Sequence, residues 1–294
     1  MNVAEFHNTR RFADTPFGRI AYVDRGHGDP ALFVHGLPLN GFHWRGVIGH
    51  LSEQRRCIAL DLMGLGYSEV PESQALDPES QAAMIAAFLD AQSIDSVDLV
   101  ASDSGGGIAQ LFLARQPRRV RSMLLTNCDA HTNSPPKALV PFIEAARAGT
   151  LAKQFVERQL HDKAAARAKD GLGGLCYADP QKLTDDAIEC YLAPLVSSPV
   201  RIAQFHRYQT SMEPNPLPGI ESALRRCQAP VRILWGTADP FFDVSWAEWL
   251  DRTFPESQGV RRLEGAKVFF AEEIPDVVAS EARTLWQIHI PAHP

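Results

Sequence analysis

Short apolar runs alternate with helical patterns in two parts of the chain, before residue 134 and after residue 228. The runs are five to nine residues long, most of them are apolar enough to be buried strands, and Gly, Asp or Asn closes most of them. Eight segments have this character: 10–14, 18–26, 31–36, 56–62, 97–102, 120–127, 230–236 and 259–265. The first two flank a TPFG turn and therefore predict an antiparallel hairpin.

Helical spacing fills most of the gaps between these runs. Apolar residues recur at three- and four-residue intervals in 42–53, 79–92, 106–117, 243–254 and 272–289. Strands that alternate with helices favour a parallel sheet, because each parallel pair needs a crossover that packs on one face. We expect an α/β fold with a mostly parallel, eight-stranded sheet and helices on both faces.

The alternation stops between residues 134 and 228. This stretch has helical spacing throughout and contains no strand-like run. The division predicts a core made of 1–133 and 229–294, with 134–228 as an inserted helical cap.

Charge and composition narrow the function classes. The formal net charge is −6 and the hydrophobic content is 45%, which is ordinary for a globular enzyme and unfavourable for nucleic acid or anionic membranes. The first residues carry no apolar leader pattern and no apolar run is long enough for a membrane span. We expect a cytoplasmic protein, monomer or homodimer, whose partner is a small-molecule substrate.

Metal and cofactor sites are not indicated either. The five cysteines are scattered, and neither Cys-x-x-Cys nor a Cys/His ligand spacing occurs. We therefore expect buried free thiols, no metal and no cofactor.

The segment VASDSGGGIAQ is typical of a sharp turn that mounts a nucleophile between a strand and a helix. Two frames fit, because small residues flank both Asp103 and Ser104. Here the sequence resembles the α/β-hydrolase family, whose elbow helix carries Ala six and Pro fourteen residues after the nucleophile. Counted from Asp103 these are Ala109 and Pro117, whereas Ser104 would meet Gln and Arg. The register favours Asp103.

Other segments carry the same resemblance. HGLP at 35–38 is similar to the oxyanion loop, and FHWRGVIGHL at 42–51 continues it as in haloalkane dehalogenases, fluoroacetate dehalogenases and epoxide hydrolases. DLMGLGYS at 61–68 and PVRILWGTADPFF at 230–242 resemble two further family motifs. The resemblance covers nearly the whole chain and implies an α/β-hydrolase fold in which the insert is the cap.

An aspartate nucleophile implies a covalent ester that water then cleaves. The resemblance assigns the oxyanion hole to the backbone N–H groups of Leu37 and Ser104. It assigns the orienting acid to Asp239, with Asp129 as the alternative. Many dehalogenases hold the halide with Asn where this chain has Leu37, which weakens the dehalogenase reading.

The family's catalytic His is missing. Alignment of the segment EGAKVFFAEE with the family pattern places Val268 at the His position, and valine cannot transfer a proton. Three explanations stay open: a His from elsewhere, either His131 or His206; participation of Lys267; or loss of this hydrolysis.

Several residues are candidates for substrate contact. They are His35, whose favoured role is nevertheless to hold its loop, Trp44, His206, Val268, and Tyr208 with Tyr191 as second choice, because epoxide hydrolases protonate the opening ring with cap tyrosines. The leading hypothesis is a hydrolase of haloalkane dehalogenase or epoxide hydrolase type acting through Asp103. The alternatives are an esterase-like hydrolase that uses Ser104, or a His-less pocket with a non-hydrolytic or binding function.

Overall fold

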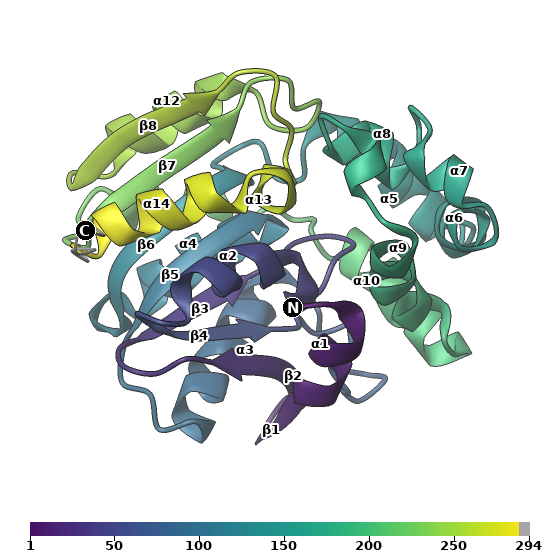
Figure 1. The fold of residues 1–294 in the computed structure, drawn as a ribbon, viewed down its shortest axis with the longest axis horizontal. Helices are drawn as coiled ribbons and strands as arrows, with labels where there is room; N and C mark the ends of the chain where they lie inside the picture. The colour runs from purple at the N-terminus through teal and green to yellow at the C-terminus, as the bar shows by residue number, and fades with distance from the viewer. Residues whose placement is uncertain (288–294) are drawn as a thin grey trace, which may run out of the picture.

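A computed structural model describes residues 1–287 (Figure 1). Its single sheet contains eight strands, as predicted. The strands are β1 (Arg11–Thr15), β2 (Gly18–Arg25), β3 (Pro30–Val34), β4 (Arg56–Leu60), β5 (Val97–Asp103), β6 (Val120–Cys128), β7 (Val231–Gly236) and β8 (Ser257–Leu263). Their spatial order is β1-β2-β4-β3-β5-β6-β7-β8. The β1–β2 and β2–β4 pairs are antiparallel and the other pairs are parallel.

Helices cover both faces of the sheet (Figure 1). α2 and α14 lie on one face, and α3, α4 and α12 lie on the other. The helices of this part are α1 (Val3–Thr9), α2 (Arg45–Leu51), α3 (Pro78–Ala91), α4 (Ser104–Arg115), α12 (Val244–Thr253), α13 (Phe270–Glu273) and α14 (Pro275–Leu285), with 3-10 turns η1 (Gly41–Trp44) and η2 (Pro117–Arg119).

Both faces are buried because apolar residues fill successive positions of the central strands. In β3, Ala31 and Phe33 pack under α2 and α14, whereas Leu32 and Val34 join the core on the opposite face. Successive side chains of a strand point to opposite faces, so a continuous apolar run is what a doubly covered strand requires. The fold class predicted from the alternation is thereby confirmed.

The last predicted helix is divided. α13 ends at Glu273 and α14 begins at Pro275. Proline lacks the N–H that would continue the ladder and is well placed at the first position of a new helix. His289 lies outside the described residues.

Only helices and turns lie between β6 and β7 in the described chain. They form a layer beside the carboxyl ends of the parallel strands, at the right of Figure 1. The helices are α5 (Val140–Arg147), α6 (Arg158–His161), α7 (Lys163–Arg167), α8 (Leu172–Cys176), α9 (Asp185–Leu192), α10 (Pro199–Thr210) and α11 (Glu221–Leu224), a π-helix η4 (Ala152–Glu157), and 3-10 turns η3 (Lys137–Leu139), η5 (Pro180–Lys182), η6 (Ala193–Val196) and η7 (Leu217–Ile220). The limits 134 and 228 for a separate cap stay a prediction.

No helix within residues 1–287 is both long and apolar enough for a bilayer crossing.

Candidate active site

Asp103 occupies the turn between β5 and α4. Its backbone has φ 57° and ψ −138°, a combination that is costly for any residue with a Cβ and that persists only where the surroundings enforce it. Asp103 is also the N-cap of α4, where the helix dipole favours a negative charge. The turn therefore holds a carboxylate at a fixed point beyond the sheet.

Two glycines make room for this turn. A Cβ on Gly36 would lie 2.3 Å from the Cβ of Asp103, and a Cβ on Gly105 would lie 2.1 Å from the carbonyl oxygen of His35. The oxyanion loop and the elbow thus approach so closely that neither position accepts a side chain.

Two backbone N–H groups converge on one oxygen of Asp103. The N–H of Leu37 donates to Oδ1 over 3.0 Å, and the N–H of Ser104 donates to the same atom over 2.5 Å. In the described chain no hydrogen bond reaches Oδ2. The carboxylate is thus held by one oxygen while the other is free to react, and the two donors are those expected for the oxyanion hole.

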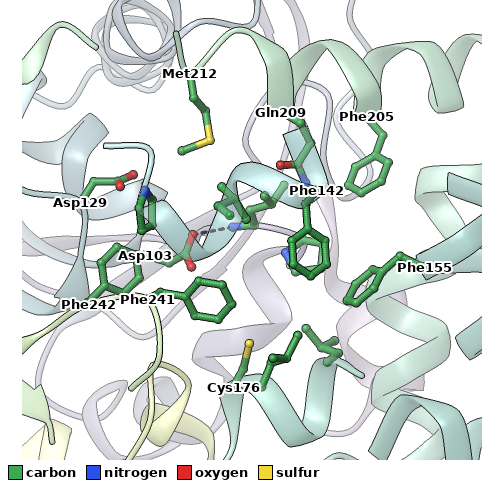
Figure 2. A pocket seen from close by; sticks show the side chains of 16 residues that line it. Asp103, Asp129, Phe142, Phe155, Cys176, Phe205, Gln209, Met212, Phe241 and Phe242 are labelled. Carbon is green, nitrogen blue, oxygen red and sulfur yellow. Dashed lines mark hydrogen bonds between the residues drawn. The ribbon is translucent and has the colours of Figure 1, made fainter. Parts of the chain in front are cut away.

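Asp103 lies at the edge of an apolar cavity of about 50 Å³ between the sheet and the inserted helices. Figure 2 shows Asp103 and Asp129 on one side and the rings of Phe142, Phe155 and Phe205 on the other. The lining residues are Leu37, Pro38, Asp103, Asp129, Pro136, Leu139, Phe142, Phe155, Leu172, Leu175, Cys176, Phe205, Gln209, Met212, Phe241 and Phe242. A cavity of this size and polarity suits a small organic molecule rather than a polar metabolite.

Three buried carboxyl groups gather at this end of the sheet. Asp129 follows β6 and lines the cavity with Asp103. Asp239 follows β7 but does not line the cavity; its Oδ1 accepts from the N–H groups of Phe241 and Phe242 at 2.8 and 3.3 Å, and its Oδ2 accepts from Asn127 Nδ2 at 2.8 Å. Asp239 is therefore fully partnered, whereas Asp129 Oδ1 is buried without a partner in residues 1–287.

Burial raises the pKa of all three carboxyl groups. For Asp103, desolvation outweighs the hydrogen bonds from Ser104 and Leu37, which lower the pKa. For Asp129, burial and the charge of Asp103 raise the pKa well above its usual value. For Asp239, burial outweighs three hydrogen bonds and raises the pKa to about 7. Each charge disfavours the others, so ionisation of one carboxyl group raises the pKa of its neighbours.

Val268 is completely buried, and it is not among the residues that line the cavity. The neighbouring Phe269 N–H donates to the carbonyl of Cys176, which does line it. The loop thus reaches the cavity wall through its backbone. The prediction that Val268 contacts substrate is not supported by this position.

The three proposed substitutes for a histidine base have other partners. His131 pairs with Glu221, 3.2 Å from Nε2 to Oε2. His206 accepts a hydrogen bond from the backbone N–H of Ala152. Lys267 Nζ donates to the carbonyl of Gly174 over 2.6 Å. None of these three side chains lines the cavity around Asp103.

Other predicted contacts also lie outside the cavity lining. His35 is buried, and its Nε2 accepts from the N–H of Leu62, so it holds its own loop. Trp44 is buried under the sheet against Phe33. The placements of His35, Trp44 and His206 do not support the prediction that they bind substrate.

The two candidate tyrosines differ in position. The hydroxyl groups of Tyr208 and Ser104 lie 3.0 Å apart, beside a second, smaller cavity that Asp129 also lines. Tyr191 donates to Glu272 over 2.7 Å and lies away from Asp103's cavity. The described chain therefore offers no tyrosine in the wall of the main cavity.

The sequence did not identify the inserted residues that complete the cavity. Phe142, Phe155, Phe205, Gln209 and Met212 come from three separate helices and a turn. Each follows ordinary helical spacing, so no local signal distinguishes a cavity wall from core. Asp129 carried a signal, a carboxylate at a strand end, but the sequence suggested only an orienting role.

Comparisons with known proteins agree with this architecture. The sequence profile of the alpha/beta hydrolase fold family matches residues 29–273. Haloalkane dehalogenase 2 of Mycobacterium tuberculosis is 36% identical over 117 residues, which are 40% of this chain and 41% of that protein. The match thus spans about two-fifths of the dehalogenase.

Two longer matches have lower identity. Cis-3-alkyl-4-alkyloxetan-2-one decarboxylase of Shewanella oneidensis is 26% identical over 253 residues, 81% of this chain and 77% of that protein. The structure of the epoxide hydrolase CorEH without ligand has a TM-score of 0.75 at 22% identity, covering 95% of this chain and 98% of that one. The matches confirm the predicted resemblance to relatives of haloalkane dehalogenases and epoxide hydrolases. With most of its length matched by the profile, this chain belongs to the alpha/beta hydrolase fold family.

Proposed function

We propose that this protein is a hydrolase that binds a small apolar electrophile and attacks it with Asp103. The observation that carries the proposal is the pair of N–H groups on Oδ1 of Asp103, beside an apolar cavity. A carboxylate needs no base to be a nucleophile. Oδ2 would attack an sp³ carbon, the bond from carbon to the leaving group would break, and an alkyl ester would result.

The second step is the cleavage of that ester by water. Charge would develop on Oδ1, where the N–H groups of Leu37 and Ser104 already point. No histidine lines the cavity within residues 1–287, and general-base assistance is typically worth about 10²- to 10⁴-fold. We therefore expect the ester to accumulate during turnover.

Intact-mass spectrometry tests the proposal directly. The protein is incubated with small alkyl bromides and epoxides, then digested, and the modified peptide is mapped. We expect an adduct on Asp103, absent in Asp103→Asn. An acyl adduct on Ser104 after incubation with esters would favour the esterase alternative, and no adduct with any reagent would favour a binding protein.

A decarboxylase reaction is a second candidate. It is favoured by Val268 at the family's His position, together with the match to the oxetan-2-one decarboxylase over 81% of this chain. Attack of Asp103 on C4 of an oxetan-2-one would break the C4–O bond and release a carboxylate. As CO₂ leaves, the electron pair of the C2–C3 bond would form the C3=C4 double bond. The bond between C4 and the Asp103 oxygen would break, and its electron pair would return to the Asp103 carboxylate. This sequence uses no water and no proton transfer.

Water labelling separates the two candidates. A cis-3,4-dialkyl oxetan-2-one is supplied in ¹⁸O water, and the headspace and the Asp103 peptide are analysed. Alkene and CO₂ without label in Asp103 support decarboxylation, whereas a labelled Asp103 and no alkene contradict it.

A further inference from the structure

We propose that Asp129 is a second catalytic residue of this site, which protonates the departing oxygen of a strained cyclic ether and then accepts a proton from the attacking water. The inference rests on the proposed function, because it requires Asp103 to form the ester. It assigns the substrate class as small apolar epoxides and replaces the histidine by a pair of carboxyl groups.

Asp129 is held next to Asp103 by backbone contacts. Residue 103 pairs with Cys128 across β5 and β6, and the N–H of Asp129 donates to the carbonyl of Asp103 over 3.3 Å. Gln110 Nε2 donates to the carbonyl of Asp129 over 2.8 Å. The carboxyl ends of parallel strands meet at one edge, so both side chains leave the sheet at the same place.

The Asp129 carboxyl group lines the cavity, and one of its oxygens has no partner in residues 1–287. Asp129 is 2% exposed, and its Oδ1 has no hydrogen-bond partner among residues 1–287. Figure 2 shows it on the same side of the cavity as Asp103. A buried polar atom without a partner is costly, and its persistence beside a cavity is a sign of a role toward a ligand.

The surroundings of Asp129 favour its protonated form. Burial and the charge of Asp103 raise its pKa well above the usual value, against a hydrogen bond to Ser134 that lowers it. The other titratable groups coupled to it, Cys128 and Tyr208, have pKa values raised by burial, so both are neutral and supply no positive charge. Two carboxyl groups can then take different roles: the neutral acid of Asp129 donates a proton, and the carboxylate of Asp103 attacks the substrate.

Three nearby groups that could also act as acids already have hydrogen-bond partners. Tyr208 bonds with Ser104 beside the smaller cavity, Tyr191 donates to Glu272, and both oxygens of Asp239 accept hydrogen bonds. Of the groups that line the main cavity in the described chain, the remaining titratable one is Cys176, whose pKa burial raises well above its usual value.

The reaction balances with these two residues and water. Oδ2 of Asp103 attacks an epoxide carbon, the ring C–O bond breaks, and the proton of Asp129 moves to the ring oxygen. Water then attacks the carbonyl carbon of the ester and gives one proton to Asp129. The diol leaves with the second proton, and Asp103 returns as a carboxylate.

In this mechanism the need for a proton from Asp129 depends on the leaving group. A bromide departs as a stable anion and needs no proton, whereas an epoxide oxygen departs as a strongly basic alkoxide. The contribution of Asp129 is therefore confined, in the first step, to the epoxide.

The test compares 1,2-epoxybutane with 1-bromobutane at pH 7, measuring the rate of Asp103 ester formation by mass spectrometry under single-turnover conditions. For Asp129→Asn we expect ester formation from the epoxide to fall by about 10²- to 10⁴-fold, with formation from the bromide changed less than about threefold. Asp239→Asn is the matched control, and it should change both rates by the same factor. Thermal unfolding of each variant monitors the fold.

Three results overturn the inference. One is an equal loss with both reagents in Asp129→Asn, which would make Asp129 a positioning residue. Another is an unchanged epoxide rate in that variant. The third is failure of the natural protein to form an ester with either reagent, which would also overturn the proposed function. If Asp129→Asn still forms the ester from the bromide but no longer reacts with the epoxide, both the proposed function and the role of Asp129 are supported. If it forms both esters at the natural rate, the proposed function is supported and the role of Asp129 is not.

Discussion

Carboxyl groups at two places in this protein have opposite electrostatic surroundings. Asp103, Asp129 and Asp239 gather at the carboxyl ends of the neighbouring strands β5, β6 and β7, and no lysine or arginine is among the cavity-lining residues of the described chain. Glu272 is just as buried but lies 2.7 Å from Arg45, 3.1 Å from His43 and 2.7 Å from the hydroxyl of Tyr191. Burial alone would raise the pKa of Glu272, but these partners lower it to about 2.

The difference separates the carboxylate that we propose to react from one that holds the structure. Arg45 belongs to α2 and Tyr191 to α9, so Glu272 joins the sheet layer to the inserted helices. Asp103 and Asp129 line the cavity without a lysine or arginine beside them in the described lining, and their burial carries a cost in stability. Uncompensated charge beside a cavity is where altered reactivity is expected.

The largest expected effect is on the reaction at Asp103. Asp103→Asn removes the nucleophile but keeps the shape of the turn, so adduct formation with 1-bromobutane should fall by at least about 10⁴-fold. Mass spectrometry of the intact protein measures it. If the variant forms an adduct on another residue at the original rate, Asp103 is not the reactive carboxylate.

The next effect is on stability at the Glu272 site. Glu272→Gln leaves Arg45 buried without its counter-charge, and the free energy of unfolding should fall by about 3–5 kcal/mol, measured by urea denaturation. Glu281→Gln is the matched control, since Glu281 pairs with Arg232 and Arg261 nearer the surface and should cost about 1 kcal/mol or less. Equal losses in the two variants would remove the special role of Glu272.

The pH dependence of stability should have opposite signs at the two sites. The raised pKa of Asp239, about 7 in the folded state, means that its contribution is present below about pH 4 and is lost as the pH rises to about 7. The loss is at most about 4 kcal/mol. Glu272, with its lowered pKa, contributes above about pH 4 and loses that contribution as the pH falls toward 2.

Urea denaturation between pH 4.5 and 7.5 measures the contribution of Asp239. In Asp239→Asn the free energy of unfolding should fall less steeply with rising pH than in the natural protein. An equally steep decline in the variant would contradict the assignment to Asp239.

The smallest expected effect concerns the hydroxyl group of Tyr191, which donates to Glu272 and accepts from Arg45 Nη1 over 3.0 Å. Tyr191→Phe removes the hydroxyl that donates to Glu272, and the free energy of unfolding should fall by about 1–2 kcal/mol. The pKa of Glu272 should rise at the same time, which shifts the acid limb of the stability curve to higher pH. A variant with unchanged stability and an unchanged acid limb would show that Arg45 and His43 suffice.

The fold was predictable because its signals are local and repeated. Most of the strands are short apolar runs, and the register of Ala109 and Pro117 placed Asp103 at the turn. The nucleophilic role itself stays a prediction. The cavity wall was not predictable, because the choice between core and cavity for Phe142 or Phe205 depends on how separate helices pack.

The position of Asp239 shows the same limit. The sequence located the carboxylate after its strand, but Asn127 and two backbone N–H groups decide where its oxygens point. Such partners come from another strand and from the turn that follows, and residue spacing does not reveal them.

The two backbone hydrogen bonds to Oδ1 of Asp103 make the two oxygens of that carboxylate chemically distinct. If ester cleavage occurs at the carbonyl carbon, the alcohol departs with the oxygen that attacked, and water replaces that atom in the protein. The held oxygen stays through every cycle. The protein would thus be a reagent as well as a catalyst: in ¹⁸O water its first product carries oxygen from the protein, and only one atom of Asp103 ever exchanges with the solvent.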